Sequence, residues 1–420
     1  MEVLVLGSGG REHAICYSLS KSNKVSKIHC LPGNAGISEI AVTENISVMD
    51  KEGVLSYLKK NPGIELTIVA PDDPLADGMV DFLEENGYKA FGPRKNAAII
   101  EASKAFSKWL MKKYDIPTAD YEEFTDYEEA KKYIDNAKYP LVVKADGLAL
   151  GKGVIICKTV EEGEKAIYDM MVESKFSLAG KKIIVEEFLV GKEVSVLCFT
   201  DGKTIVPMVS SQDHKRVFDN DEGLNTGGMG TFSPSRIYTE DMQKYVYDNI
   251  IIPTIRAMEK EGRLFKGVLY FGLMLTDKGV KVLEYNARFG DPETQVVLPK
   301  LKNDFVDVCL ATIDGTLDTI NFEWETDPMV CVIIASGGYP VKYEKGKEIT
   351  IDKLEDGVLV FHAGTTIKDG KLVTNGGRVL GVTASGKTMK DAQTKAYRNV
   401  EKIHFEGMHY RKDIGNKYYD

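Results

Sequence analysis

Cysteines are few and scattered in this chain. The 420 residues include six, at positions 16, 30, 157, 198, 309 and 331, with no C-x-x-C pair and no tight spacing. Zinc sites and disulfide frameworks need clustered or regularly spaced cysteines, so the pattern argues against both. It is typical of the reduced, mostly buried thiols of a cytoplasmic protein.

Long apolar runs and an excess of positive charge are also lacking. No apolar stretch approaches the length that crosses a membrane, and the strand-like run 2–6 leaves no room for a secretion signal at the start of the chain. The net charge is −9, and the absence of a basic block argues against binding of nucleic acid. We expect a cytoplasmic enzyme with no membrane or nucleic-acid partner.

What the chain contains is an ordinary globular composition and a clear strand–helix rhythm. With 43% apolar residues over 420 positions, two to four domains are expected. Within residues 1–100, the strand-like runs Val3–Leu6, Lys27–Leu31 and Leu66–Ala70 alternate with helical segments. This order predicts an α/β domain with a doubly wound parallel sheet, whose ligands lie at the carboxyl ends of the strands.

The rest of the chain has a mixed middle and a strand-rich end. A strand at Leu141–Ala145 and a return strand at Val154–Cys157 enclose a glycine-rich loop. The segments Lys182–Phe188 and Glu193–Thr200 are predicted to pair as a hairpin. After Pro328, short strands with turn signals and a terminal helix predict a small, mostly β domain.

Residues 282–295 carry the most informative chemistry. Alternation along a strand predicts that one face comprises Val282, Glu284, Asn286 and Arg288, and the other Leu283, Tyr285 and Ala287. A carboxylate and an amide oxygen are ligands that Mg²⁺ takes beside nucleotide phosphates, and a guanidinium suits a carboxylate or a phosphate. A half-buried strand with a solvated polar face is the alternative.

A glycine-rich turn, Gly7-Ser-Gly-Gly-Arg-Glu-His13, follows the first strand. Its backbone N–H groups and the helix N-terminus predict an anion site. A dinucleotide fingerprint is disfavoured because Glu12 replaces its third glycine and Pro32 ends the second strand where a ribose-binding acid is expected. A monophosphate fits better, and a tight turn without a ligand is the alternative.

Lysines and glycines predict a second phosphate site. Lys144 lies near the end of a buried strand, where a charge needs an anionic partner. The glycines of 147–153 allow backbone amides to close over phosphates, although the segment is not a P-loop. Lys104 offers another cation, for which a solvated side chain is the alternative.

Two later segments complete the set of candidates. Residues 185–193 have the form of a hinge beside a nucleotide base, where Glu193 either accepts from ribose hydroxyls or is an exposed strand residue. The polar tracts 210–216 and 223–234 lie between apolar strands, and such loops are either functional or disordered. Both charge signs meet at 212–216, as an amino-acid substrate would need.

Five motifs occur in order along essentially the whole chain. They are G-S-G-G-R-E-H at 7–13, P-G-N-A-G at 32–36, K-A-D-G-L-A-x-G-K-G-V at 144–154, N-T-G-G-M-G at 225–230 and R-F-G-D-P-E at 288–293. Together they resemble the ATP-grasp ligases and, among these, the glycinamide ribonucleotide synthetase family of purine synthesis. The resemblance implies ATP-dependent joining of glycine to 5-phosphoribosylamine through glycyl phosphate.

The resemblance also implies a domain organisation. An N-terminal Rossmann-like domain at 1–102 would bind phosphoribosylamine, and an ATP-grasp domain at 103–327, with a lid subdomain at about 118–190, would follow. A mostly β domain would occupy 328–420. In the ATP-grasp module two α+β subdomains would clasp ATP, and the loop 147–153 would close over it.

The site residues that the resemblance implies fall into four groups. ATP would be held by Lys104, Lys144, Gly151, Lys152, Gly153, Glu186, Glu187, Leu189 and Glu193, and Mg²⁺ or Mn²⁺ by Glu284 and Asn286. Phosphoribosylamine would be held by Gly9, Gly10, Arg11, Asn34 and Asp72, and glycine by Asp213 and Arg288. The catalytic residues of this monomeric enzyme would be Arg288, Lys144 and Asp213.

The chain departs from the family pattern in three places. Asp72 lies in A-P-D-D-P-L where the family usually has G-P-E-x-P-L, and Leu224 replaces a usual proline. The strand at 269–275 lacks a carboxylate, so the metal would depend on Glu284, Asn286 and the ATP phosphates. Rival interpretations are another ATP-grasp ligase or carboxylase, an NAD-dependent oxidoreductase and a non-catalytic nucleotide sensor.

Overall fold

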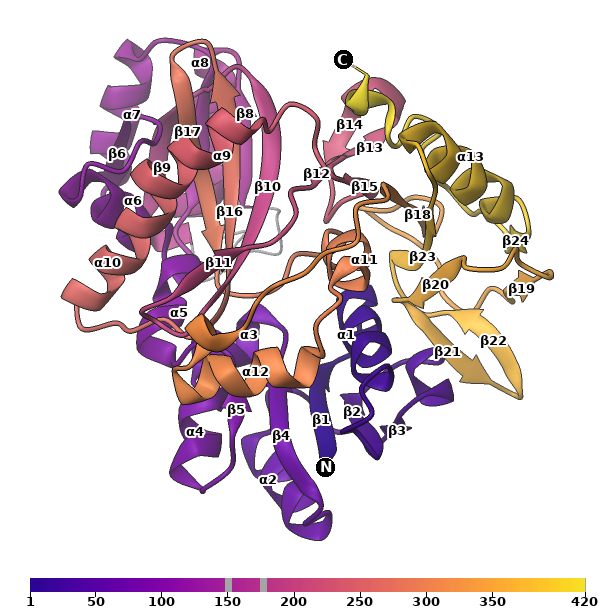
Figure 1. Ribbon diagram of the computed structural model, residues 1–420. Helices are drawn as coiled ribbons and strands as arrows, with labels where there is room; N and C mark the ends of the chain where they lie inside the picture. Colours follow the sequence, from indigo (N-terminus) through magenta and orange to yellow (C-terminus); the bar gives the residue numbers. More distant parts are fainter. Residues whose placement is uncertain (148–152, 174–179, 420) are drawn as a thin grey trace.

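The N-terminal part of the protein is a five-stranded parallel sheet wrapped by helices. The computed structural model describes residues 1–147, 153–173 and 180–419. The N-terminal elements are β1 (Glu2–Gly7), α1 (Gly10–Ser20), β2 (Lys27–Pro32), β3 (Val42–Thr43), α2 (Lys51–Lys60), β4 (Ile64–Val69), α3 (Asp72–Asp77), α4 (Met79–Glu85), β5 (Ala90–Phe91) and α5 (Lys95–Ala102). The strand order β3-β2-β1-β4-β5, parallel throughout, confirms the predicted doubly wound sheet (Figure 1).

A small antiparallel sheet with two helices packed on it follows. Its elements are β6 (Tyr121–Phe124), α7 (Tyr127–Asn136), β7 (Leu141–Ala145), β8 (Val154–Cys157), α8 (Val160–Ile167), a π-helical turn (Tyr168–Val172) and β9 (Ile183–Glu187). The strands lie in the order β6-β9-β7-β8. α7 and α8 bury Ala130, Ile134 and Ile167 against the apolar side chains of β7 and β9, which forms a core separate from the rest.

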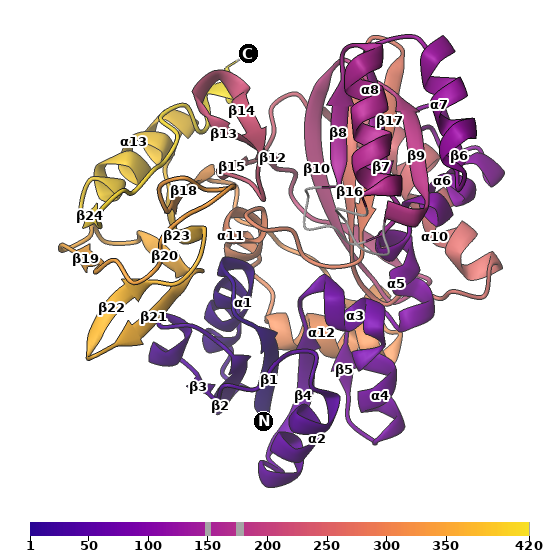
Figure 2. The same cartoon turned by 180° about the vertical axis from the view of Figure 1, so that it is seen from behind.

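A second antiparallel sheet lies beside the first, with the order β11-β10-β16-β17 (Figure 2). Its strands are β10 (Lys192–Thr200), β11 (Ile205–Pro207), β16 (Gly267–Thr276) and β17 (Gly279–Asn286), and the neighbouring helices are α6 (Lys104–Lys113), α9 (Glu240–Val246) and α10 (Ile252–Lys260). Where the two sheets meet, Ala119, Leu189, Met274 and Leu283 form a small apolar cluster. The two predicted α+β subdomains are therefore present.

The predicted hairpin between residues 182–188 and 193–200 is wrong. β9 pairs with β6 and β7, whereas β10 pairs with β11 and β16, so the two strands belong to different sheets. The chain crosses between the sheets at Gly191, where any side chain would collide with the carbonyl of Leu275. Sequence alternation shows that two strands exist but does not show which strand each one pairs with.

The predicted alternation along β17 is wrong at its centre. Gly272 pairs with Glu284, but the next residue of β16, Leu273, pairs with Val282, so Leu283 is the extra residue of a β-bulge. Val282 consequently lies in the main core, and Leu283 faces the apolar cluster between the sheets. Beyond the bulge the predicted alternation is confirmed, because Tyr285 is buried in the core.

The C-terminal part is mostly β, as predicted. Its elements are β18 (Met329–Ala335), β19 (Thr350–Ile351), β20 (Leu359–His362), β21 (Thr365–Lys368), β22 (Lys371–Thr374), β23 (Arg378–Ser385), α13 (Met389–Val400) and β24 (Ile403–His404). α13 packs on β18 and β23. The central segment between β11 and β18 contributes β12 (Gln212–Asp213), β13 (Arg216–Phe218), β14 (Glu222–Asn225), β15 (Gly230–Ser233), α11 (Thr294–Val297) and α12 (Phe305–Asp314).

One sheet joins the central and C-terminal parts of the chain. Its strand order is β12-β15-β18-β23-β20, so two strands from before residue 328 pair into the C-terminal sheet. The division into three domains stays a prediction. In the described part of the chain, no helix is both long enough and apolar enough to cross a membrane.

Candidate active site

A cavity of about 900 Å³ lies between the N-terminal sheet, the two antiparallel sheets and the C-terminal part. The predicted site residues that line it are Arg11, Asp72, Lys104, Lys144, Gly153, Glu186, Glu187, Leu189, Glu193, Asp213, Glu284, Asn286 and Arg288. Gly9, Gly10 and Asn34 are not among its lining residues. The predicted nucleotide contacts Gly151 and Lys152 lie outside the described residues.

Two buried lysines share one carboxylate on the wall formed by the first antiparallel sheet. Lys144 Nζ lies 2.9 Å from Glu186 Oε2, and Lys108 Nζ lies 3.2 Å from the same oxygen. Burial lowers the pKa of Lys108 to about 8, although Glu186 opposes the shift. The other oxygen of Glu186, Oε1, is buried and has no partner among the described residues. This wall therefore carries two lysines but only one glutamate, and among the described residues Oε1 of that glutamate is a hydrogen-bond acceptor without a donor.

Lys104 is held at the start of α6. Ser103 caps that helix, and its hydroxyl also donates to Asp146, which accepts the amide of Ala105 as well. Lys104 Nζ donates to the carbonyl of Gly147, the first residue of the predicted phosphate loop, at 2.8 Å. Burial lowers the pKa of Lys104, partly offset by Glu284. The cation predicted as a second phosphate contact thus sits on the cavity wall, next to the loop.

The hinge residues form an apolar slot with a polar edge. Leu189, Met274 and Leu283 make the apolar walls, and Glu186 lies at the edge. Glu187 is exposed and pairs with Lys281 at 3.0 Å. A flat apolar base fits between such walls, and a buried carboxylate oxygen suits an amino group on its edge.

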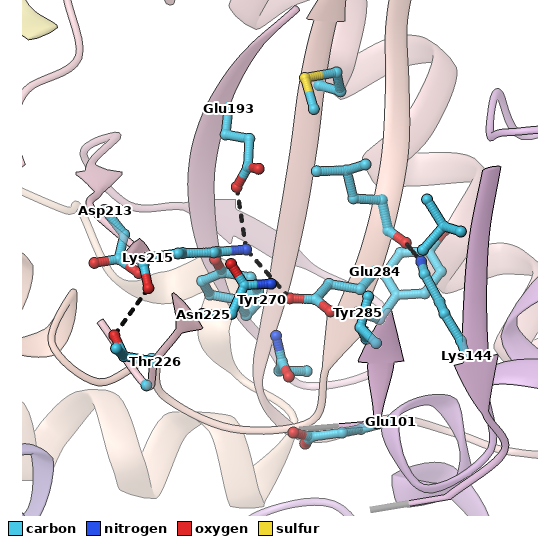
Figure 3. A pocket seen from close by; sticks show the side chains of 18 of the residues that line it. Glu101, Lys144, Glu193, Asp213, Lys215, Asn225, Thr226, Tyr270, Glu284 and Tyr285 are labelled. Carbon is cyan, nitrogen blue, oxygen red and sulfur yellow. Dashed lines mark hydrogen bonds and ion pairs between the residues drawn. The ribbon is translucent and has the colours of Figure 1, made fainter. Parts of the chain in front are cut away.

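Lys215 bridges two carboxylates that the sequence assigns to different substrate groups. Its Nζ lies 3.1 Å from Glu193 and 3.6 Å from Glu284, and Figure 3 shows the Lys215 amino group between the two carboxylates. The Glu193 carboxylate raises the pKa of Lys215 despite burial, so the side chain is cationic. Burial opposes ionisation of Glu284, but Lys215 and the other cavity cations hold its pKa below the ordinary value. Sequence reasoning gave Lys215 no individual role.

Arg288 is held by a carboxylate of the N-terminal part, Glu101. Its NH2 lies 2.9 Å from Glu101, whose other oxygen accepts the amide of Ala287. Burial opposes the charge of Arg288, but Glu101 and Asp72 raise its pKa. The pKa of Glu101 is raised to about 6 by burial, although Arg288 opposes that rise. Arg288 Nε is buried without a partner among the described residues, so this guanidinium has an unused donor in the cavity wall.

Asp213 is a half-buried carboxylate at the opposite wall. Its Oδ1 accepts the amide of His214 at 2.7 Å. Burial and the nearby Glu293 raise its pKa. Glu293 Oε1 in turn accepts from Ser195 and Tyr270. Two neighbouring carboxylates, one of them buried, suit a cationic ligand group such as an ammonium.

In the predicted phosphate turn after β1, the Gly9 amide and the Arg11 and Asn34 side chains already donate to groups of the protein. The amide of Gly9 and Arg11 Nε both donate to the buried carboxylate of Glu12, each at 2.6 Å. Arg11 NH1 donates to the carbonyl of Phe289. The side-chain amide of Asn34 donates to two backbone carbonyls. Only Arg11 of these residues reaches the cavity.

The C-terminal part contributes residues that sequence reasoning missed. They are Tyr339, Pro340, Tyr343, Arg378 and Lys417. No motif signalled them, because all five lie outside the motifs that the sequence contains. For Lys108 a signal existed, since it lies one helical turn after Lys104 on the same face of α6.

The donors around Glu284 fit a metal that is shared with phosphates. No group of three or more His, Cys, Asp or Glu side chains suited to a metal occurs among residues 1–147, 153–173 and 180–419. Mg²⁺, however, is commonly bound by one or two protein oxygens together with phosphates and water. Glu284 and Asn286 supply one carboxylate and one amide oxygen on the cavity wall.

The fold and this cavity define the class of protein. Two α+β subdomains enclose a cavity lined by lysines, which is the arrangement of an ATP-grasp protein. The biotin carboxylase domain of 2-oxoglutarate carboxylase from Hydrogenobacter thermophilus, solved with MgADP and bicarbonate, has the same fold. It is 17% identical, with a TM-score of 0.75, and the match covers 97% of this chain and 91% of that one.

The particular family follows from models that match along the chain. Phosphoribosylglycinamide synthetase models match at 1–101 (N domain), 102–294 (ATP-grasp domain) and 329–417 (C domain). The chain belongs to the phosphoribosylglycinamide synthetase family.

Relatives and a solved structure agree with this assignment. A phosphoribosylamine–glycine ligase from Caldanaerobacter subterraneus subsp. tengcongensis is 49% identical over 419 residues, which is 100% of both chains. Another from Halalkalibacterium halodurans is 48% identical over 99% of this chain and 97% of that protein. The crystal structure of phosphoribosylamine–glycine ligase from Thermotoga maritima is 38% identical, with a TM-score of 0.86, over 98% of this chain and 100% of that one.

Proposed function

We propose that the protein joins glycine to 5-phosphoribosylamine with ATP, giving glycinamide ribonucleotide, ADP and phosphate. The observation that carries the proposal is the meeting of three kinds of group on one cavity. Lysines suited to phosphates, a carboxylate–amide pair suited to a divalent metal, and the Asp213 and Arg288 pair suited to an amino acid all line it. This residue set supports the activity named for the relatives.

The reaction begins by activating the carboxylate of glycine. A carboxylate oxygen of glycine attacks the γ-phosphorus of ATP, the bond to the β-phosphate oxygen breaks, and ADP leaves with that electron pair. The charge of the transferring phosphoryl group is spread over Lys144 and Arg288. Lys215 lies between Glu193 and Glu284 and adds a third cation along the same wall.

The second step forms the carbon–nitrogen bond. The amine nitrogen of phosphoribosylamine attacks the acyl carbon of glycyl phosphate, the bond from carbon to the phosphate oxygen breaks, and phosphate leaves while the nitrogen loses a proton. Holding the reactants in order supplies much of the rate, on the order of 7–11 kcal/mol for well-oriented groups.

The nucleotide is assigned to the wall between the two antiparallel sheets. Its base occupies the slot beside Leu189 and Glu186, and its ribose hydroxyls donate to Glu193. Its phosphates meet Lys104 and Lys144, together with the segment that includes the undescribed Gly151 and Lys152. Glu284 and Asn286 would hold Mg²⁺ or Mn²⁺, which when bound would neutralise phosphate charge.

The other two substrates are assigned to the remaining walls. The ammonium group of glycine meets Asp213, and its carboxylate meets Arg288. Phosphoribosylamine lies toward Arg11 and Asp72, at the carboxyl ends of β1 and β4. A phosphate at Gly9 would have to displace Glu12, and a phosphate at Asn34 would have to compete with the two carbonyls that accept from its side-chain amide. The monomeric state, the cytoplasmic location and closure of the 147–153 loop stay predictions.

ADP release is the direct test. The purified chain is assayed with ATP, Mg²⁺, glycine and freshly made phosphoribosylamine, and each substrate is omitted in turn. We expect full ADP formation only in the complete mixture, with glycinamide ribonucleotide formed in equal amount. ADP formation that is indifferent to glycine would overturn the proposal.

A further inference from the structure

Arg378 connects two loops that lie far apart in the sequence. It begins β23, and its NH1 donates to the carbonyl of Gly227 at 2.6 Å and to the carbonyl of Asp291 at 2.8 Å. The carbonyl of Gly228 lies 3.4 Å from the same nitrogen. Arg378 NH2 forms an ion pair with the Asp291 carboxylate at 3.2 Å. One guanidinium from the C-terminal part thus bonds both the 225–230 loop and the 288–293 turn.

The same loop is held from its other side by Tyr339. The amide of Gly227 donates to the Tyr339 hydroxyl at 3.0 Å, while its carbonyl accepts from Arg378. A Cβ at Gly227 would lie 3.0 Å from Arg378 Cζ, which is closer than real Cβ contacts allow without movement. Both polar groups of one loop residue are therefore bonded to the C-terminal part of the chain.

The loop that is held in this way packs against the wall assigned to glycine. A Cβ at Gly228 would lie 2.8 Å from Asp213 Oδ1, so the backbone there approaches the carboxylate closely. The 288–293 turn, which Arg378 also bonds, begins with Arg288, and Arg288 is assigned to the carboxylate of glycine. Arg378 therefore fixes the spacing between the two elements that would hold the two ends of the amino acid.

We propose that Arg378 is a positioning residue for the glycine site, setting the distance between Asp213 and Arg288 without touching the substrate. This inference rests on the proposed function, and in particular on the assignment of glycine to those two side chains. Arginine suits the task because its planar fork bonds several acceptors at once, whereas lysine offers a single charged nitrogen.

The charge of Arg378 is secured by its surroundings. Burial opposes ionisation, but Asp291, Tyr339, Asp213 and Glu293 raise its pKa. Replacement by lysine keeps the charge and removes the fork, so Arg378→Lys is the informative substitution. Arg398→Lys is the matched control, because Arg398 is an exposed residue of α13 in the same part of the chain, paired with Glu355.

The test measures KM for each substrate in the full-length enzyme. For Arg378→Lys we expect KM for glycine to rise about tenfold, which is the loss of one charge-assisted hydrogen bond, while KM for ATP changes less than about twofold. Tyr339→Phe should raise KM for glycine by a smaller factor. Arg398→Lys should match the wild type, and thermal unfolding of all three variants verifies that they are folded.

A double-mutant cycle separates a positioning role from a direct one. If Arg378 acts through Asp213, Arg378→Lys should add little to the rise in KM for glycine already caused by Asp213→Asn. Fully additive effects, an unchanged KM for glycine, or equal rises for ATP and glycine would each overturn the inference. Glycine-dependent ADP release by the wild type tests the proposed function separately, so that function can stand if this inference fails.

Discussion

The cavity wall assigned to the nucleotide (the nucleotide wall) and the turn after β1 differ in how their charged side chains are paired. On the nucleotide wall, Lys108 and Lys144 share one carboxylate oxygen of Glu186. At the turn, one carboxylate, Glu12, accepts both the amide of Gly9 and Arg11 Nε. The first arrangement has two cations for one carboxylate and so leaves positive charge for a phosphate, whereas in the second the Arg11 guanidinium is already paired with a carboxylate. Residue types therefore predict where an anion can bind, and internal pairing decides which site is ready for one.

Arg288→Ala removes a cation that, unlike the turn after β1, keeps an unused donor in the cavity wall among the described residues, and it should have the largest effect. Turnover should fall about 100-fold or more, as it does when a preorganised donor to a developing charge is removed. The measurement is kcat for ADP release at saturating substrates. Arg94→Ala, which removes an exposed arginine paired with Glu84, is the control and should leave kcat unchanged. Near-normal turnover of Arg288→Ala would remove this residue from the catalytic set.

Glu284→Gln tests the assignment of Glu284 and Asn286 as the ligands of one divalent metal ion. It keeps the shape of the side chain and removes the charge, so the Mg²⁺ concentration for half-maximal ADP release should rise by roughly 10–100-fold. A metal titration at fixed ATP measures this shift, with Glu348→Gln, an exposed glutamate paired with Lys371, as the control. An unchanged titration would place the metal elsewhere.

Arg11→Met tests the turn after β1, where Arg11 is paired with Glu12. If Arg11 also contacts phosphoribosylamine, KM for that substrate should rise by about tenfold while KM for ATP stays constant. Lys21→Met, at the exposed end of α1, is the control. If KM for phosphoribosylamine does not change, Glu12 keeps Arg11 fully occupied, and the phosphate of that substrate is bound by other residues.

Lys108→Met tests the ion pair between Lys108 and Glu186 and should have the smallest effect on activity. Between pH 8 and 10.5 the unfolded chain holds a proton on Lys108 that the folded chain has lost, because burial lowers the folded pKa to about 8. Unfolding free energy should therefore rise with pH in this window, by up to about 1.4 kcal/mol per pH unit from this one group.

Denaturant unfolding at several pH values measures that slope. In Lys108→Met the contribution is absent, so its free energy should vary less with pH than that of the wild type. Lys112→Met, an exposed lysine on the same helix, should keep the wild-type slope. Equal slopes in Lys108→Met and the wild type would show that Lys108 ionises normally in the folded protein.

Local patterns in the sequence predicted most of the fold. The strands at Leu141–Ala145 and Val154–Cys157 have the predicted bounds, because each is a short apolar run next to a turn. Pairing between distant strands was not predictable in the same way. The hairpin around Gly191 failed because β9 and β10 take partners from elsewhere in the chain. The bulge at Leu283 depends on the register with β16, which no local pattern encodes.

The candidate site was predictable where a motif carries several polar residues. Glu284, Asn286 and Arg288 line the cavity as alternation predicted. Arg378 was not predictable, because two of its partners are the backbone carbonyls of Gly227 and Asp291, which leave no trace in residue type, and all of its partners lie far away in the sequence. Lys215 was visible in a charged tract, but only the fold places it between Glu193 and Glu284.

The sheet β12-β15-β18-β23-β20 has a consequence for the order in which the protein is made. Asp213 lies on β12, which pairs with β15, and the other neighbour of β15 is β18. A ribosome-bound chain that has not yet reached β18 leaves β15 with an open edge and lacks Arg378 altogether. The wall assigned to glycine is therefore completed only after β18 and Arg378 have been synthesised. A nascent chain that already contains the residues of the nucleotide wall still lacks a complete glycine site.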